Sequence, residues 1–229
     1  MKIKLLILIL GFSIQGIISQ NCEAISPYKQ GTTLEYTNYN KKGKVKSVDN
    51  YTVKSVTTEN GEMLITIDTT TKNKKNDSAT NTQILRCVNG DFYVSLSDYL
   101  SHQNDNQEST LELKAEGDFV EFPDDIKEGY ELKDATIDLK MGGGDDTSGV
   151  SFANMEVRNR KVLQEENFTI NDYEFNAYKV SFDYVFTMSI LKIRGSGIEW
   201  YVKGVGIVKT ESYSKKGKLK WTRELTKLN

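Results

Sequence analysis

The sequence has very few of the residues that metal centres and thiol- or histidine-dependent catalysis require. It contains two cysteines and one histidine, His102, whereas a structural zinc site alone takes four cysteine or histidine ligands. It also lacks the patterns of familiar active sites: a G-x-S-x-G elbow, an H-E-x-x-H helix, and a phosphate-binding glycine loop followed by lysine and a helix. We therefore expect no metal, no cofactor and no enzymatic activity.

Three features could still support chemistry, and each has a simpler explanation. His102 lies in a polar stretch, where an exposed side chain is the ordinary outcome. Asp145 and Asp146 lie in the glycine-rich segment GGGDDTSG, which lacks the alternating acidic pattern and distal glutamate of a calcium loop. The many carboxylates leave a glycosidase-like pair open, because the distance between two carboxylates cannot be read from a sequence.

The start of the chain, MKIKLLILILGFSIQGIISQ, has the features of a cleaved secretory signal. Two lysines precede an apolar run, and the small residue Ser19 offers a cleavage position. Polar residues and glycines interrupt the run below the ~20 apolar residues that a spanning helix needs, and no later segment is long and apolar enough to span. We expect a signal peptide over residues 1–19 and a single β-rich domain over residues 20–229.

A lipid anchor is not expected. A lipoprotein signal places a small residue directly before the lipidated cysteine, whereas Gln20 and Asn21 precede Cys22. The mature chain should therefore be exported to the periplasm, the cell surface or the medium without an anchor.

The charge and the cysteine count fit an exported protein. The net charge is −2, and it becomes more acidic when the signal lysines are removed, so nucleic acid is not an expected partner. An even cysteine count in an exported chain predicts that Cys22 and Cys87 are joined. Such a disulfide would stabilise the fold by about 4 kcal/mol in the chain-entropy model.

Alanine and long helical patterns are scarce, and apolar residues recur with a period of two, so the chain is predicted to be all-β and mainly antiparallel. The clearest strand places apolar side chains on one face at Tyr178, Val180, Phe182, Tyr184, Phe186, Met188 and Ile190. Its length predicts bending around a core. Trp200 and Tyr201 fall on opposite faces of another strand, so at most one is expected in the core, and the other is available to stack on a sugar or a partner.

Turn residues divide the strands into hairpins. Asn89-Gly90 predicts a tight two-residue turn, because both residues accept positive φ. Residues 39–46 (YNKKGKVK) and 213–220 (YSKKGKLK) predict two equivalent hairpins whose lysines keep the tips soluble and discourage edge pairing, with an anion site as the alternative. Gly206, inside an apolar run, predicts a bulge or a close backbone approach.

One segment departs from the strand pattern. In SLSDYLSHQ, Leu96, Tyr99 and Leu100 fall at helical spacing behind Ser95, which predicts a short helix. Residues 102–109 and 142–149 are expected to be loops.

Four segments together resemble a known group of proteins. They are PYKQGTTLEYTNYNKKGKV (27–45), CVNGDFYVSLSDYL (87–100), FPDDIKEGYELKDATIDLKM (122–141) and IEWYVKGVGIVKTESYSKKGKL (198–219). The chain resembles the TapB-like exported proteins of Gram-negative bacteria, which are related to a domain family of unknown function with a fold similar to the LolA and LolB lipoprotein carriers. The resemblance implies a strongly curved antiparallel sheet, or half-barrel, around one or two short helices. It carries over no catalytic residue.

The carriers hold acyl chains in their concave face, so the resemblance suggests a function by analogy. We expect an exported, non-enzymatic binding module that holds a lipid or another apolar ligand. The expected contacts are Tyr178, Val180, Phe182, Tyr184, Phe186, Met188, Ile190 and Trp200. The alternative is a structural or protein-interaction component of the cell envelope whose core is filled by its own side chains. A void of several hundred Å³ would favour the first hypothesis and a solid core the second.

Overall fold

The computed structural model describes Cys22 and residues 27–73, 78–95, 113–117, 119–141, 150–170 and 173–229. These residues form fourteen β-strands: β1 (Thr33–Asn40), β2 (Val45–Glu59), β3 (Glu62–Asn73), β4 (Ser78–Val88), β5 (Asp91–Ser95), β6 (Leu113–Gly117), β7 (Phe119–Phe122), β8 (Glu131–Leu132), β9 (Ala135–Met141), β10 (Val150–Ile170), β11 (Tyr173–Met188), β12 (Leu191–Val202), β13 (Gly206–Ser214) and β14 (Leu219–Leu228). Within the described ranges only Cys22 has a helical backbone, and no helix there is long and apolar enough to cross a bilayer.

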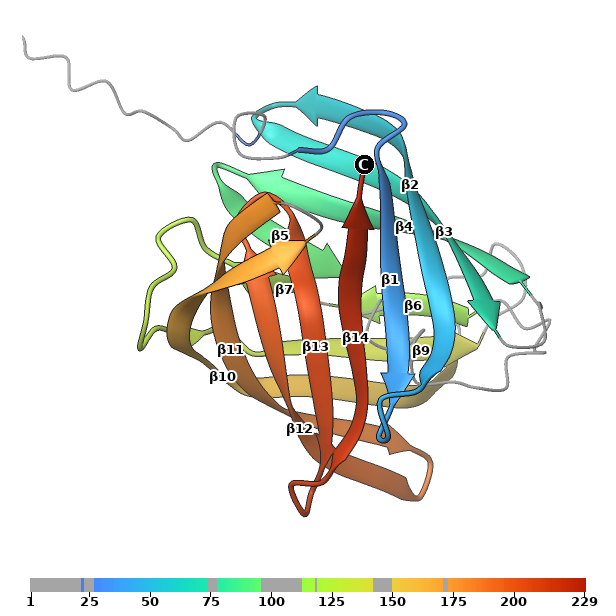
Figure 1. Ribbon diagram of the computed structural model, residues 1–229. Coiled ribbons are helices and arrows are strands. Elements are labelled where there is room, and N and C mark those ends of the chain that lie inside the picture. The colour runs from blue at the N-terminus through green and yellow to red at the C-terminus, as the bar shows by residue number, and fades with distance from the viewer. Residues whose placement is uncertain are drawn as a thin grey trace, which may run out of the picture.

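The strands form one antiparallel sheet that curls into a nearly closed barrel (Figure 1). The order along the sheet is β6-β9-β10-β11-β12-β13-β14-β1-β2-β3-β4-β5-β7, with β8 paired to β10. The first and last strands are neighbours, because β1 pairs with β14 as well as with β2. The all-β prediction is confirmed, and the sheet curves beyond a half-barrel.

Arg160 links the two sides of the gap in the barrel. It lies on β10, is 2% exposed, and donates from Nη1 to the carbonyl oxygens of Glu121 and Lys133, both at 3.0 Å. Its guanidinium also lies 4.8 Å from the centre of the Phe122 ring. Because Glu121 and Phe122 belong to β7 at the far end of the strand order, this side chain helps to hold the curled sheet together.

Strand β11 follows the predicted alternation over most of its length. Val180, Phe182 and Tyr184 are buried in the core, and Tyr178 and Phe186 pack against it. The strand ends at Met188, which is 39% exposed, so the prediction that Ile190 continues this face is wrong. Ile190 lies in the turn to β12 and is fully exposed, because Ser189 takes a positive φ of 51° and reverses the chain.

Two glycines let the aromatic side chains of β11 lie flat across β12. Gly197 pairs with Phe182, and Gly195 pairs with Tyr184. A Cβ atom on Gly197 would lie 2.1 Å from Cζ of Phe182, and one on Gly195 would lie 2.4 Å from the Tyr184 hydroxyl. The rings therefore occupy the space that side chains would take, and the two strands can bend tightly around the core.

The predicted turns are confirmed. Asn89 and Gly90 both have positive φ, at 53° and 96°, and join β4 to β5. Gly43 and Gly217 have nearly equal φ values of 71° and 70° in their lysine-rich turns. Gly206 has φ of 100° beside a shift in the pairing register of β12 and β13, as expected of a bulge.

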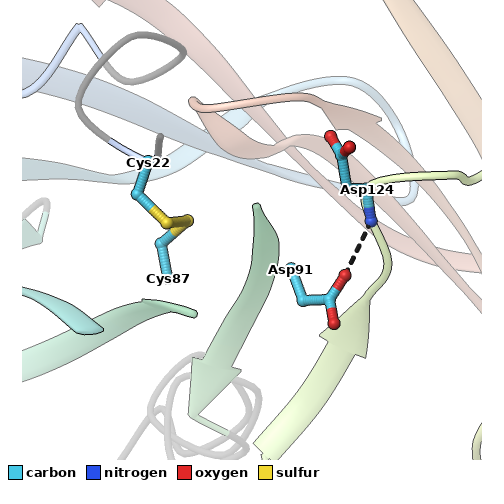
Figure 2. Close-up of a disulfide and its surroundings, with 4 residues drawn as sticks. All are labelled: Cys22, Cys87, Asp91 and Asp124. Atoms are coloured by element: carbon cyan, nitrogen blue, oxygen red, sulfur yellow. Dashed lines mark hydrogen bonds between the residues drawn. A yellow bond between two sulfur atoms is a disulfide. The ribbon is translucent and has the colours of Figure 1, made fainter. Parts of the chain in front are cut away.

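Cys22 and Cys87 form a disulfide in the structure, as the cysteine count predicts (Figure 2). The bond joins the N-terminal part of the chain to β4, and both cysteines are buried. Nearby, the Asp91 carboxylate accepts a hydrogen bond of 2.9 Å from the backbone N–H of Asp124, which ties the start of β5 to the segment after β7.

Several sequence predictions concern residues outside the described ranges. These are the signal peptide at 1–19, the short helix at 96–100, His102 with its polar stretch, and the loop at 142–149 that carries Asp145 and Asp146.

Candidate binding pocket

A partly open pocket lies inside the barrel, on the half formed by β13, β14 and β1 to β5. Its walls come from residues that share the inner face of these strands and from the chain before β1 and after β12. They are Tyr28, Leu34, Tyr36, Tyr51, Ile67, Gln83, Leu85, Val94, Val205, Gly206, Ile207, Thr210, Trp221 and Arg223. Alternation along each strand delivers these side chains to one face, so the pocket is a product of the strand pattern.

The apolar wall of the pocket is aliphatic and almost fully buried. Leu34, Ile67, Leu85, Val94 and Val205 are between 3% and 7% exposed. Pairing of β1 through β5 brings the first four together, and Val205 joins them from the segment between β12 and β13. This wall suits an apolar group that enters the barrel.

Three tyrosines form a second wall, with their hydroxyls directed to hydrogen-bond partners. Tyr28 donates to the carbonyl of Val205, and Tyr36 donates to the carbonyl of Ile207 at 3.0 Å. Tyr36 and Tyr51 meet edge to face, with ring centres 5.1 Å apart. Burial raises the pKa of Tyr28 well above its usual value, and the neighbouring tyrosines add to this effect. The Tyr28 hydroxyl therefore stays protonated and acts as a donor.

Arg223 supplies the positive charge of the pocket. Its guanidinium lies 3.7 Å from the centre of the Tyr36 ring, and Nη2 donates to the Tyr51 hydroxyl at 2.5 Å. The same hydroxyl accepts a bond of 3.3 Å from Nε2 of Gln83. Cationic and amide donors thus meet at the Tyr51 hydroxyl within the pocket, which favours a ligand with an oxygen acceptor near Arg223.

The carboxylate of Asp49 pairs with the positive charge of Arg223. The carboxylate is completely buried, with Oδ2 3.6 Å from Nε of Arg223. It accepts hydrogen bonds from Nδ2 of Asn38 at 2.8 Å and from Oγ1 of Thr71 at 2.9 Å. Buried charge is tolerated only where it is paired and hydrogen-bonded, so these contacts explain why Asp49 can sit inside the barrel.

The pocket is modest in size. Its volume is about 70 Å³, which falls short of the several hundred Å³ that would favour a ligand-holding void over a self-filled core. One water molecule needs roughly 10–15 Å³ of such volume. The pocket therefore has room for about five waters, or for a short acyl chain that fills the same volume. Three lining residues keep partial exposure, namely Ile207, Trp221 and Arg223, and two of these lie on β14.

The eight residues predicted to contact a ligand lie elsewhere in the barrel, and none of them lines this pocket. Val180, Phe182 and Tyr184 belong to the core, Tyr178 and Phe186 pack against it, and Met188 and Ile190 are exposed at the far end of the β11–β12 hairpin. Their role as ligand contacts remains a prediction.

Trp200 lies on the opposite face of β12 from its neighbours Glu199 and Tyr201. It pairs with Lys179 and Lys209, whose ammonium groups lie 5.2 Å and 4.6 Å from its ring centre. The expectation that only one of Trp200 and Tyr201 is buried is wrong, since they are 5% and 1% exposed. The alkyl stems of the two lysines cover the indole on the face that the alternation predicts to be open.

Trp200 also binds a carboxylate through its indole. Nε1 donates to Glu166 on β10, and this hydrogen bond is the main cause that lowers the pKa of the Glu166 carboxyl below its usual 4.5. With its ring covered and its N–H engaged, Trp200 serves to join β10, β12 and β13.

Sequence reasoning overlooked the pocket residues, although a signal for them exists. Trp221, Arg223 and Leu225 alternate along KWTRELTKL, so Arg223 falls on the same face as a buried leucine. A charge within an apolar face marks a buried polar site. The strand's many charges hide this signal, because Lys220, Glu224 and Lys227 make the segment look like a solvent-exposed edge.

Comparison with known proteins finds the same fold in solved bacterial proteins. The sequence profile of the DUF3108-like family matches residues 29–225. A Bacteroides fragilis protein described as exported, with a YmcC-like fold, superposes with a TM-score of 0.74 at 21% identity, over 90% of this chain and 98% of that chain. A Parabacteroides distasonis protein described as a lipoprotein gives a TM-score of 0.74 at 23% identity, over 89% of this chain and 97% of that chain. No curated protein matches the sequence.

Proposed function

The chain belongs to the DUF3108-like family, and we propose that it is an exported, non-enzymatic binding protein that holds a partly apolar ligand in its barrel pocket. The observation that carries this proposal is the combination of a buried aliphatic wall with the donors of Arg223 and Gln83 in one partly open space. Pockets of this kind, apolar with a few placed polar groups, are typical of small-molecule sites.

The ligand that fits best is amphiphilic. Its apolar part would contact Leu34, Ile67 and Leu85, and a carboxylate or ester oxygen would face Arg223. The volume of about 70 Å³ accepts one short acyl segment or a branched group, so the rest of a longer lipid would extend past Trp221. The acyl-chain analogy of the LolA and LolB carriers is consistent with such a ligand.

Binding without catalysis is supported by the residues around the pocket. Among its described lining residues none is a carboxylate, a cysteine, a histidine or a lysine. The Tyr28 hydroxyl donates to a backbone carbonyl, and burial keeps it protonated, which makes it a poor nucleophile and a poor base.

Export and the absence of a lipid anchor are supported by the cysteines. Disulfides persist in oxidising compartments, and a secretory signal such as the start of this chain resembles directs a protein to such a compartment. A lipoprotein carries its diacylglyceryl group on the sulfur of its first cysteine, whereas the sulfur of Cys22 is bonded to Cys87. The two states exclude each other, so we propose that this protein, unlike the relative described as a lipoprotein, carries no anchor. Intact mass of the exported chain tests this directly.

A second candidate function has an observation in its favour. Large buried side chains such as Phe92, Phe122 and Tyr201 fill much of the barrel, and Phe122 stacks on Tyr201 with ring centres 4.1 Å apart. A self-filled barrel would serve as a structural or protein-interaction component of the envelope.

Uptake of a fluorescent fatty-acid probe by delipidated protein separates the two functions. The binding proposal expects saturable uptake that Trp221→Ala weakens at least about tenfold, since the indole contributes a large contact area at the pocket. The matched control is Tyr173→Ala, which removes an aromatic ring that is 63% exposed outside the pocket. If the wild-type protein takes up no more probe than an unrelated β-protein, the binding proposal fails and the structural one replaces it.

A further inference from the structure

Three turns meet at one end of the barrel, away from the C-terminus (Figure 1). The β1–β2 turn adjoins the β13–β14 turn, because Asn40 pairs with Trp221. The β11–β12 hairpin lies next to the β13–β14 turn, because Gly195 pairs with Ser214. Beyond Gly195 the β11–β12 hairpin continues for four more residues of β12, whereas β13 ends at Ser214. The β11–β12 hairpin therefore projects past the β13–β14 turn.

These turns form a strongly basic surface, which we call the basic end. Residues 40–46, 188–194 and 214–220 are described throughout, and none of them is acidic. Their ten basic residues are Lys41, Lys42, Lys44, Lys46, Lys192, Arg194, Lys215, Lys216, Lys218 and Lys220, all of which are exposed. The whole chain has a net charge of −2, so this positive charge is concentrated at one end.

The most projecting part of the basic end is apolar. Ile190 is 101% exposed at the tip of the hairpin, and Leu191 and Met188 beside it are 48% and 39% exposed. Lys192 and Arg194 follow directly along β12. Three exposed apolar side chains within four positions, next to exposed basic residues, favour a contact outside the barrel.

We propose that the basic end docks onto a bilayer that carries anionic phospholipid headgroups. The lysines lie against the headgroups, and Ile190 and Leu191 enter the interface between headgroups and acyl chains. Charges on flexible lysine side chains, spread over three separate turns, suit a fluid surface of many phosphates better than one rigid protein partner. The apolar tip is also small, and a stable protein interface needs roughly 800 Å² from each partner.

The basic end also lies close to the pocket. Trp221 directly follows Lys220, and it is one of the partly exposed residues that line the pocket. A bilayer at this end would therefore bring amphiphiles near the opening, although docking itself does not depend on the pocket holding any ligand.

Vesicle flotation with the full mature chain tests the proposal. We expect binding to phosphatidylcholine vesicles that contain about 30% phosphatidylglycerol, little binding to pure phosphatidylcholine, and at least a tenfold loss between about 0.1 M and 1 M salt. The variant Lys41→Gln, Lys42→Gln, Lys215→Gln, Lys216→Gln should bind at least about tenfold more weakly. Lys29→Gln, Lys54→Gln, Lys127→Gln, Lys161→Gln changes the net charge equally and should bind as the wild type does.

The apolar tip has its own test. Ile190→Ser should weaken vesicle binding several-fold, whereas Leu163→Ser, which alters a leucine that is 41% exposed on β10, should not. All of these positions are exposed, and circular dichroism verifies that each variant is folded. The proposal is overturned by equal binding to both kinds of vesicle, by unchanged binding of the turn variants, or by binding to an acidic polypeptide without binding to vesicles. None of these outcomes bears on fatty-acid uptake, so the pocket proposal is judged separately.

Discussion

The guanidinium of Arg223 lies 3.7 Å from the centre of the Tyr36 ring, with the two residues at opposite ends of the chain and on neighbouring strands. Cation–π contact holds the flat guanidinium against the wall of the pocket, and its hydrogen bond to Tyr51 fixes its direction. The guanidinium is thereby kept inside the barrel at a defined position, where the proposed amphiphilic ligand would meet it.

The first prediction concerns the pairing of Arg223 with Asp49. Arg223→Met should destabilise the fold by about 3 kcal/mol, because it leaves the buried Asp49 carboxylate without its guanidinium neighbour. The double variant Asp49→Asn, Arg223→Met should recover much of that loss. Urea denaturation measures both together with Asp49→Asn alone, and losses that simply add across the two sites would show that the two side chains are not coupled.

The second prediction concerns the glycines of β12. Gly197→Ala should destabilise the protein by about 2 kcal/mol, because the new methyl group would overlap the Phe182 ring. Phe182→Leu frees that space, so adding Gly197→Ala to Phe182→Leu should cost clearly less than adding it to the wild type. Additive losses in thermal or urea denaturation would contradict the close packing.

The sequence was sufficient for features that depend on neighbours along the chain. The turns at Asn89-Gly90, Gly43 and Gly217 and most of the alternation in β11 could be predicted, because the local backbone decides them. The disulfide followed from the cysteine count and the signal-like start.

The pocket could not be predicted in the same way. It depends on the pairing of β1 with β14, which sets Tyr36 beside Arg223 although the two residues are 187 positions apart in the sequence. The burial of Trp200 depends on lysines from two other strands that cover its ring. Ile190 was misplaced because the reversal occurs at Ser189, a residue that rarely adopts positive φ.

The third prediction is a pH dependence at Glu166. The hydrogen bond from Trp200 lowers the pKa of this carboxyl in the folded protein below 4.5. The ionised form is therefore favoured by folding, and the resulting stability is complete above pH 4.5 and is lost as the pH falls through the folded pKa. The difference in urea midpoint between the wild type and Glu166→Gln should shrink between about pH 6 and pH 3. A constant difference would mean that the hydrogen bond does not favour the carboxylate.

The fourth prediction concerns the disulfide between Cys22 and Cys87. Reduction should lower the free energy of unfolding by up to about 4 kcal/mol and expose both thiols to alkylation. The variant Cys22→Ser, Cys87→Ser should be insensitive to reductant. Alkylation of both cysteines under native, non-reducing conditions would contradict the bond, and a mass increase of a diacylglyceryl group would contradict the unanchored mature chain.

The central claim is that an amphiphile binds inside the barrel beside Trp221, and the two tryptophans of the chain offer a direct measurement. Trp221 lines the pocket, whereas Trp200 lies beneath lysines on the other face of β12. A brominated fatty acid quenches indole fluorescence only at short range. The variant Trp200→Phe, in which Trp221 is the only indole, should be quenched saturably, and Trp221→Phe should keep its fluorescence at the same ligand concentrations. Equal quenching of the two variants, or quenching of Trp200 alone, would contradict a ligand site in this pocket.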